Sequence, residues 1–171
     1  TANIIAVAGL SCASAASVTI GKTIGEKRLH MIKPYTVTLQ WIFLIIGLVS
    51  GAVLFIVKDL IIDFYAISSE TAVLTRHFLL VLCVTTIGTC YEYPVASGII
   101  AGGGDTKYPA IVENLFTWLF VIPASALSAF VFRWPPLVTF MWMKADQILK
   151  CLPNGIRCNR YKWVRQLTRD K

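Results

Sequence analysis

Residues 89–109 read Thr-Cys-Tyr-Glu-Tyr-Pro-Val-Ala-Ser-Gly-Ile-Ile-Ala-Gly-Gly-Gly-Asp-Thr-Lys-Tyr-Pro. This stretch opens inside an apolar run long enough to span a bilayer, and the run contains one carboxylate, Glu92. Pro94, two residues later, interrupts the hydrogen bonding of the helix. The run ends in a polar turn, Gly102–Thr106, and a second apolar run begins at Pro109. A buried acid, a kinked helix and a tight turn in one membrane hairpin indicate a functional element as well as a membrane anchor.

The composition is that of a membrane protein, because 56% of the 171 residues are hydrophobic and only 15% are charged. This length has room for about five helices of roughly 20 residues, each able to cross about 30 Å of hydrocarbon. We therefore predict an all-α fold, a polytopic transmembrane helix bundle. The chain begins with Thr, and no basic stretch precedes its first apolar run. A secretory signal is therefore not indicated, and we expect a piece of a longer chain.

We expect spans at about 1–21, 34–57, 71–101, 109–132 and 135–152, and a basic interfacial tail at 153–171. The first span is rich in Ala, Ser and Gly, so it should pack closely against other helices. The fifth carries Lys144, Asp146 and Lys150 in its last turns, and these long side chains can extend to the interface. The tail alternates basic residues with apolar ones such as Trp163, which is typical of an amphipathic helix on an anionic membrane surface.

The basic residues predict the orientation. With five spans, all but three of the 16 lysines and arginines fall on the side of the C-terminus; the three are Lys58, Arg76 and Arg133. The positive-inside rule then places the C-terminus in the cytoplasm. The net charge of +7 lies beside apolar runs, so it indicates topology and anionic lipid, with no nucleic acid as partner. We expect a multi-pass protein of the cell inner (plasma) membrane, in contact with the lipid bilayer.

Glu92 is the candidate for chemistry inside the membrane. It lies fourteen residues after Phe78 and ten before Gly102, which places it between the midplane of its span and the cytoplasmic side. A carboxylate at this depth is costly to ionise. It can carry a proton or pair with Na⁺ or a cationic substrate, so we predict an ion-coupling or substrate-pairing role. The alternative is an acid bonded to a neighbouring helix or standing in a water-filled vestibule.

Aromatic and proline residues accompany this acid. Tyr91 and Tyr93 flank it and are the candidate cavity wall, because they can donate a hydrogen bond or stack on an aromatic cation. Pro94 and Pro123 each free a backbone carbonyl one turn earlier. They are candidate helix hinges, and the alternative is that they only shape the packing.

The turn that follows contains Gly102, Gly103, Gly104 and Asp105. A cytoplasmic hairpin turn that needs positive φ explains it better than a phosphate cradle does. The five cysteines form no CxxC pair and the two histidines lie in flanks, so we predict no metal site and no catalytic residue. We also predict no cofactor apart from transported H⁺ or Na⁺ as the coupling ion.

Three stretches, in order, resemble one family. Gly98-Ile-Ile-Ala-Gly-Gly-Gly-Asp-Thr106 is similar to the Gly-Ile-Leu-Arg-Ala-Gly-Gly-Asp-Thr turn between helices ten and eleven of the multidrug and toxic compound extrusion (MATE) transporters. Ser14–Arg28 resembles the segment that ends helix eight in that family, where an apolar run closes in Gly-x-x-x-Gly before basic residues. Pro135-Pro136 with Lys144–Lys150 and Lys162–Thr168 resembles helix twelve and the tail of bacterial members.

The resemblance implies that the chain is helices eight to twelve of twelve, five spans of an incomplete six-helix lobe. The family exports organic cations and drugs in exchange for H⁺ or Na⁺. The implied partners are therefore lipophilic organic cations as substrates, together with an N-terminal lobe and the first helix of this lobe, which are missing from the sequence. The fragment alone is not expected to transport. Ala101 departs from the family turn, which usually has Arg there.

Three other functions fit the sequence less well than a multidrug antiporter does. A lipid-linked saccharide flippase of the same superfamily tends to line its cavity with Arg and Lys, and the apolar cores of the first four spans contain none. A membrane-embedded enzyme needs paired acids or a histidine cluster, which a single Glu92 does not supply. A purely structural membrane subunit would give no reason for an acid beside Pro94.

Overall fold

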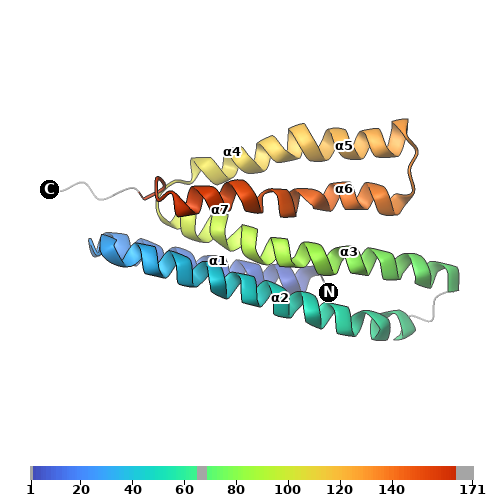
Figure 1. Ribbon diagram of the computed structural model, residues 1–171, viewed down its shortest axis with the longest axis horizontal. Helices are drawn as coiled ribbons and strands as arrows, with labels where there is room; N and C mark the ends of the chain where they lie inside the picture. The colour runs from blue at the N-terminus through green and yellow to red at the C-terminus, as the bar shows by residue number, and fades with distance from the viewer. Residues whose placement is uncertain (1, 65–68, 165–171) are drawn as a thin grey trace.

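The computed structural model describes residues 2–64 and 69–164. Within these residues the fold is all-α and has no strand, as the sequence predicts (Figure 1). The helices are α1 (Ala2–Gly25), a 3₁₀ turn (Leu29–Met31), α2 (Ile32–Phe64), α3 (Ser69–Tyr93), α4 (Lys107–Phe116), α5 (Ile122–Ala126), α6 (Pro136–Leu149) and α7 (Cys151–Asn159). Three π-helical stretches extend or join them: Pro94–Ile100 after α3, Thr117–Val121 between α4 and α5, and Leu127–Val131 after α5.

Three helical stretches of the described residues are long and apolar enough to cross a membrane, namely Leu29–Leu60, Thr71–Ile100 and Lys107–Val131. They correspond to the predicted spans 34–57, 71–101 and 109–132. Of the other two predicted spans, 1–21 lies within α1 from residue 2 onward, and 135–152 contains α6 and the start of α7. That these two also cross the membrane stays a prediction, as do the boundaries of the basic tail.

Large apolar side chains cover the outside of the bundle. Those of α2 and of the α4–α5 helix are exposed along much of their length: Trp41, Ile45, Val49, Val53, Ile56, Leu60, Trp118, Leu119, Phe130 and Val131. Soluble monomers rarely expose apolar surface on this scale, and helices satisfy every backbone polar group internally, as hydrocarbon requires. The chain is therefore an all-α membrane bundle.

The helices form two layers that meet at α3 (Figure 1). α1 and α2 lie on one side of α3, and the α6–α7 helix with the α4–α5 helix lies on the other. α1 packs on the stretch Pro94–Ile100 through small residues: a Cβ atom on Gly98 would lie only 2.8 Å from the backbone oxygen of Ala13. The expected close packing of the first span is thereby confirmed.

The chain end differs from the predicted surface helix. The helix continues as α7 to Asn159, and the chain then turns back so that Trp163 is fully buried, with 0% of its surface exposed. Its indole Nε1 donates a hydrogen bond to the backbone oxygen of Cys158 at 2.7 Å. Trp163 therefore packs inside the protein, and the expectation that it lies on the membrane surface is wrong. Residues 165–171 of the tail lie outside the described residues.

Candidate functional site

Glu92 lies in the last turns of α3, within the span Thr71–Ile100, and only 9% of its surface is exposed. The Nδ2 amide of Asn154, on α7, donates a hydrogen bond to Glu92 Oε1 at 2.8 Å. Asn154 is itself almost fully buried, with 1% of its surface exposed. The acid is thus held by a residue 62 positions later in the chain, and it lies in the bundle instead of facing lipid.

A cavity of about 440 Å³ opens beside Glu92 where three helical stretches meet. The residues lining this Glu92 cavity are Thr89, Glu92, Tyr93, Ala96 and Ser97 from α3 and its extension, Pro109, Ala110 and Glu113 from α4, and Asp146, Gln147 and Lys150 at the end of α6. Thr89 donates a hydrogen bond from its hydroxyl to Gln147 Oε1 at 2.7 Å, which ties α3 to α6 at the cavity wall. Four charged side chains line this cavity, in contrast to the apolar outside of the bundle.

Lys150 is the cation of this cavity. Its Nζ lies 2.9 Å from Glu113 Oε1 and 2.8 Å from Asp146 Oδ2, so one ammonium group joins α4 to α6. Its surface is only 2% exposed, so the expectation that Lys150 extends to the interface is wrong. The two acids differ, because the Asp146 side chain is 13% exposed and that of Glu113 is 61% exposed. Glu113 is thus the more solvated of the two acids.

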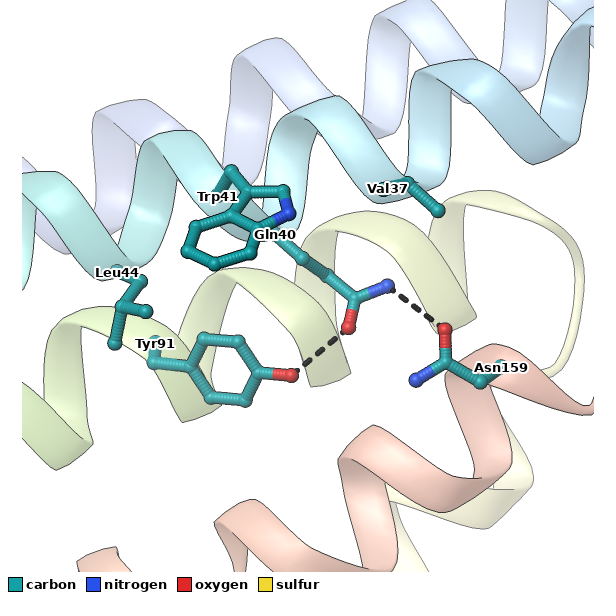
Figure 2. Close-up of a pocket in the computed structure, with 6 residues that line it drawn as sticks. All are labelled: Val37, Gln40, Trp41, Leu44, Tyr91 and Asn159. Carbon is teal, nitrogen blue, oxygen red and sulfur yellow. Dashed lines mark hydrogen bonds between the residues drawn. The ribbon is translucent and has the colours of Figure 1, made fainter.

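Tyr91 and Tyr93 lie on different sides of α3, because successive helical residues are separated by about 100°. Tyr93 lines the Glu92 cavity and is 37% exposed. Tyr91 lines a second pocket, of about 300 Å³, between α2, α3 and α7 (Figure 2). Its hydroxyl donates a hydrogen bond to Gln40 Oε1 at 2.9 Å. Both tyrosines line a cavity, but only Tyr93 shares one with Glu92.

The two candidate hinges have different surroundings. Pro94 is buried and begins the π-helical stretch Pro94–Ile100 directly after Glu92's turn of helix. Pro123 lies in α5 between two π-helical stretches, and its side chain is exposed. Both prolines therefore coincide with local departures from α-helical hydrogen bonding, as their missing N–H groups require. A hinge role for either stays a prediction.

The glycine turn is held by the end of the chain. Gly104 has φ of 99°, a conformation that favours glycine. A Cβ atom on Gly103 would clash with the ring of Trp163, and one on Gly102 would clash with Ser17 of α1. Asp105 is buried and its Oδ2 lies 2.6 Å from Nη2 of Arg157 on α7. The turn therefore closes one end of the bundle, with α1 on one side and α7 on the other.

Neighbouring contacts complete this closure. The guanidinium of Arg157 lies 4.8 Å from the centre of the Tyr108 ring, and the Tyr108 hydroxyl donates a hydrogen bond to the backbone oxygen of Pro153 at 2.9 Å. Cys158 is fully buried here, and this burial raises the pKa of its thiol to about 12. A thiol with so high a pKa is chemically inert near neutral pH. The closure therefore combines packing with the Arg157–Asp105 ion pair, a cation–π contact and a hydrogen bond.

Sequence reasoning missed Asn154 and the paired role of Lys150. Both belong to a stretch that the sequence presents as a basic interfacial end, where polar residues are ordinary. Their roles depend on contacts with residues 62 and 37 positions earlier in the chain. The spacing Lys144, Asp146, Lys150 contained one usable signal, because Asp146 and Lys150 are four apart on one helix face.

Comparison with known proteins identifies the family. A model of the MatE family matches residues 1–127. The chain belongs to the MatE family. It is 31% identical over 114 residues to a probable multidrug resistance protein NorM of Listeria innocua, 67% of this chain and 25% of that protein. A protein of the same name in Halalkalibacterium halodurans is 24% identical over 120 residues, 70% of this chain and 26% of that protein.

The MatE chain spans about a quarter of the length of the curated relatives it matches. No solved structure matches it. The family match confirms the resemblance read from Ser14–Arg28 and Gly98–Thr106, which both lie within residues 1–127. Together with the apolar helices, it makes the chain part of a multi-pass membrane protein. Its placement as helices eight to twelve of twelve stays a prediction.

Proposed function

We propose that this chain is part of a secondary antiporter that exports organic cations and drugs in exchange for H⁺ or Na⁺, with Glu92 as the coupling or substrate-pairing acid. The observation that carries the proposal is a buried carboxylate, inside a helix long and apolar enough to span a membrane, at the wall of a cavity lined by charged side chains. Intramembrane acids are costly and usually serve a transported ion or substrate. The names of the relatives, probable multidrug resistance proteins, support drugs as the cargo.

The charges in the cavity single out Glu92 among its three carboxylates. Lys150 forms ion pairs with Glu113 and Asp146. Among the described residues, Glu92 has no Lys, Arg or His ion-pair partner and is held by the neutral amide of Asn154. It is therefore the acid with a charge to offer to a proton, a sodium ion or a cationic substrate. Exchange follows if coupling ion and substrate compete for that one carboxylate.

The rest of the transporter follows from the same proposal. The bilayer and lipophilic cations are its partners, with the remaining helices supplied outside this sequence. The C-terminus and the glycine turn face the cytoplasm, and the membrane is the inner (plasma) membrane. This orientation puts all but three of the lysines and arginines on the cytoplasmic side. No resident cofactor is required, and the relatives' names support a transporter and not an enzyme.

The charge pattern does not favour the lipid-linked saccharide flippase. Such a substrate carries a pyrophosphate, which needs unpaired cations in the cavity. The cation lining the Glu92 cavity, Lys150, is already paired with two carboxylates.

Transport in everted vesicles tests the proposal, with the protein expressed from its complete gene. An amphipathic fluorescent cation is added, and its uptake is followed after imposing first a proton gradient and then a sodium gradient. The variants are wild type, Glu92→Gln and the matched control Glu26→Gln, which makes the same chemical change at a partly exposed acid of the basic turn. We expect gradient-driven uptake in wild type and control and none in Glu92→Gln.

The other outcomes are equally informative. Uptake that persists in Glu92→Gln would be consistent with a transporter of this family and would place the coupling acid elsewhere in the protein. If protein that is shown to be inserted in the membrane gives no uptake under either gradient, multidrug export is refuted. The lipid-linked saccharide flippase then becomes the favoured function.

A further inference from the structure

The pocket beside Tyr91 has an amphipathic lining. This Trp41 groove is lined by Val37, Gln40, Trp41, Leu44, Tyr91 and Asn159 (Figure 2). Leu44 and the Tyr91 ring lie at one end, and Val37 and Asn159 lie at the other. Between them, Gln40 accepts the hydrogen bond from Tyr91 and donates one from Nε2 to Asn159 Oδ1 at 3.3 Å. The groove is thus apolar at its inner end and polar at the end nearer the start of α2.

Two cations stand close in the chain to residues that line the polar end. Lys33 lies one turn before Val37 on the same face of α2, and Arg160 directly follows Asn159 at the end of α7. Both side chains are exposed, and neither forms an ion pair within the described residues. Nearby cations behave differently, because Arg28 pairs with Glu26 and Arg157 pairs with Asp105. Two cations without an ion pair, each one turn or one residue from the lining of this end, suit an anionic group.

The groove is continuous with the lipid-facing surface. Trp41 is 61% exposed, and Ile45 and Leu48, one and two turns further along α2, are exposed as well. A ligand that enters from the side therefore meets hydrocarbon-facing residues at one end and, at the other, the helix ends that carry Lys33 and Arg160. Trp is also the residue type that settles where membrane hydrocarbon meets the headgroups. A soluble anion would use the cations alone and would leave the apolar half of the groove uncovered.

We propose that the Trp41 groove binds one anionic phospholipid from the leaflet at this end of the bundle. Its phosphate lies between Lys33 and Arg160, and an acyl chain lies along Trp41 and Leu44. The amides of Gln40 and Asn159 lie at the depth of the ester groups. This site is on the face of α3 opposite the Glu92 cavity, and it does not depend on the proposed transport activity.

Fluorescence quenching tests the site in the protein expressed from its complete gene, reconstituted in phosphatidylcholine bilayers. A minor fraction of the lipid is replaced by brominated phosphatidylglycerol or by brominated phosphatidylcholine. The Trp41 contribution is the emission of wild type minus that of Trp41→Phe. The control is Trp118, exposed on the α4–α5 helix, measured in the same way with Trp118→Phe. We expect Trp41 to favour the anionic quencher by on the order of tenfold, since each basic side chain near a membrane contributes a several-fold preference.

Charge variants decide the outcome. Lys33→Ala with Arg160→Ala should remove the preference at Trp41, and Lys107→Ala with Arg133→Ala, which removes the same charge elsewhere, should leave it. Trp118 should respond equally to both quenchers. Equal quenching of Trp41 by both lipids would overturn the proposal in favour of unspecific lipid contact. Absence of quenching at Trp41 with normal quenching at Trp118 would overturn it too, because protein would then fill the groove.

Discussion

Tyr91 and Glu92 are consecutive residues of one helix, yet they belong to two different environments. Glu92 faces a cavity that contains two further acids and a lysine. Tyr91 faces a groove lined only by uncharged aliphatic, aromatic and amide side chains. Successive residues of a helix point in directions about 100° apart. One helix can therefore direct a charged side chain into an internal cavity and the next side chain toward a surface that lipid can reach.

The two sides also differ in how their polar groups are satisfied. On the Glu92 side, the bonds join α3 and α4 to α6 and α7 through charged groups. On the Tyr91 side, a neutral chain of hydrogen bonds runs from Tyr91 through Gln40 to Asn159. Charged bonds in a membrane bundle are costly to break by removing one partner, whereas neutral ones contribute modestly. Perturbations should therefore have larger effects on the Glu92 side.

The largest expected effect is a difference in thiol reactivity between positions 158 and 159 of α7. Cys158 faces the buried interior, and Asn159 faces the Trp41 groove. The pKa of the Cys158 thiol is raised to about 12 by burial, against about 8.5 for an ordinary cysteine. In a background without other cysteines, Cys158 should react with a maleimide at about pH 8 on the order of a thousandfold more slowly than Asn159→Cys. Its rate should rise about tenfold per pH unit below the pKa, as the thiolate fraction does. Similar labelling rates at both positions would show that α7 does not shield Cys158.

Lys150→Met should be the most destabilising change in the Glu92 cavity. It leaves Asp146 charged and mostly buried without its partner, and breaking such a pair costs about 3 kcal/mol. The measurement is thermal unfolding in detergent micelles. The double variant Lys150→Met with Asp146→Leu should recover most of the loss, because position 146 then carries no buried charge that lacks its partner. A double variant as unstable as the single one would mean that packing, not charge, is the function of Lys150.

Asn154→Leu should lower cation-driven dye uptake about tenfold, because a hydrogen bond to a charged group contributes about 1.5 kcal/mol or more. Asn154 is the donor that holds Glu92. The matched control is Asn114→Leu on α4, where the amide donates only to the backbone oxygen of Ala110, within its own helix. Initial rates in everted vesicles, normalised to the amount of inserted protein, give the comparison. Equal uptake rates in the two variants would show that Asn154 has no part in the function of the Glu92 cavity.

Tyr91→Phe should have the smallest measurable effect, a loss of about 1 kcal/mol in unfolding free energy, because it removes one neutral hydrogen bond. Tyr93→Phe is the control on the other side of α3, at a partly exposed position, and it should unfold like wild type. Chemical denaturation in micelles resolves the pair. A larger loss for Tyr93→Phe would contradict the assignment of the two tyrosines to separate pockets.

Several elements of the site were readable from residues alone because their causes are local. An acid in an apolar run, a proline two positions later and a run of three glycines each restrict the backbone or the charge where they stand. The positive φ at Gly104 and the three membrane-length helices confirm such local predictions. The coupling role of Glu92 and the hinge roles of Pro94 and Pro123 stay predictions.

The chain end shows where this reasoning stopped. Trp163 among basic residues has the pattern of a membrane-surface helix, but the space above Gly103 accepts its ring and buries it. Lys150 at a helix end has the pattern of an interfacial lysine, but two carboxylates lie within 3 Å of its ammonium group. In both cases the competing partner is distant in the sequence, so no local pattern contains it.

The sequence by itself determined that this is an all-α membrane protein of the MATE kind, with one acid inside an apolar span and a glycine turn after it. Hydrophobicity, charge placement and turn chemistry act over a few residues, so they are legible without coordinates. Only the tertiary structure decided that Asn154 holds Glu92, that Lys150 neutralises its neighbours, and that Tyr91 belongs to the opposite groove. These depend on which helix faces meet, and that is settled by the packing of side chains from distant parts of the chain.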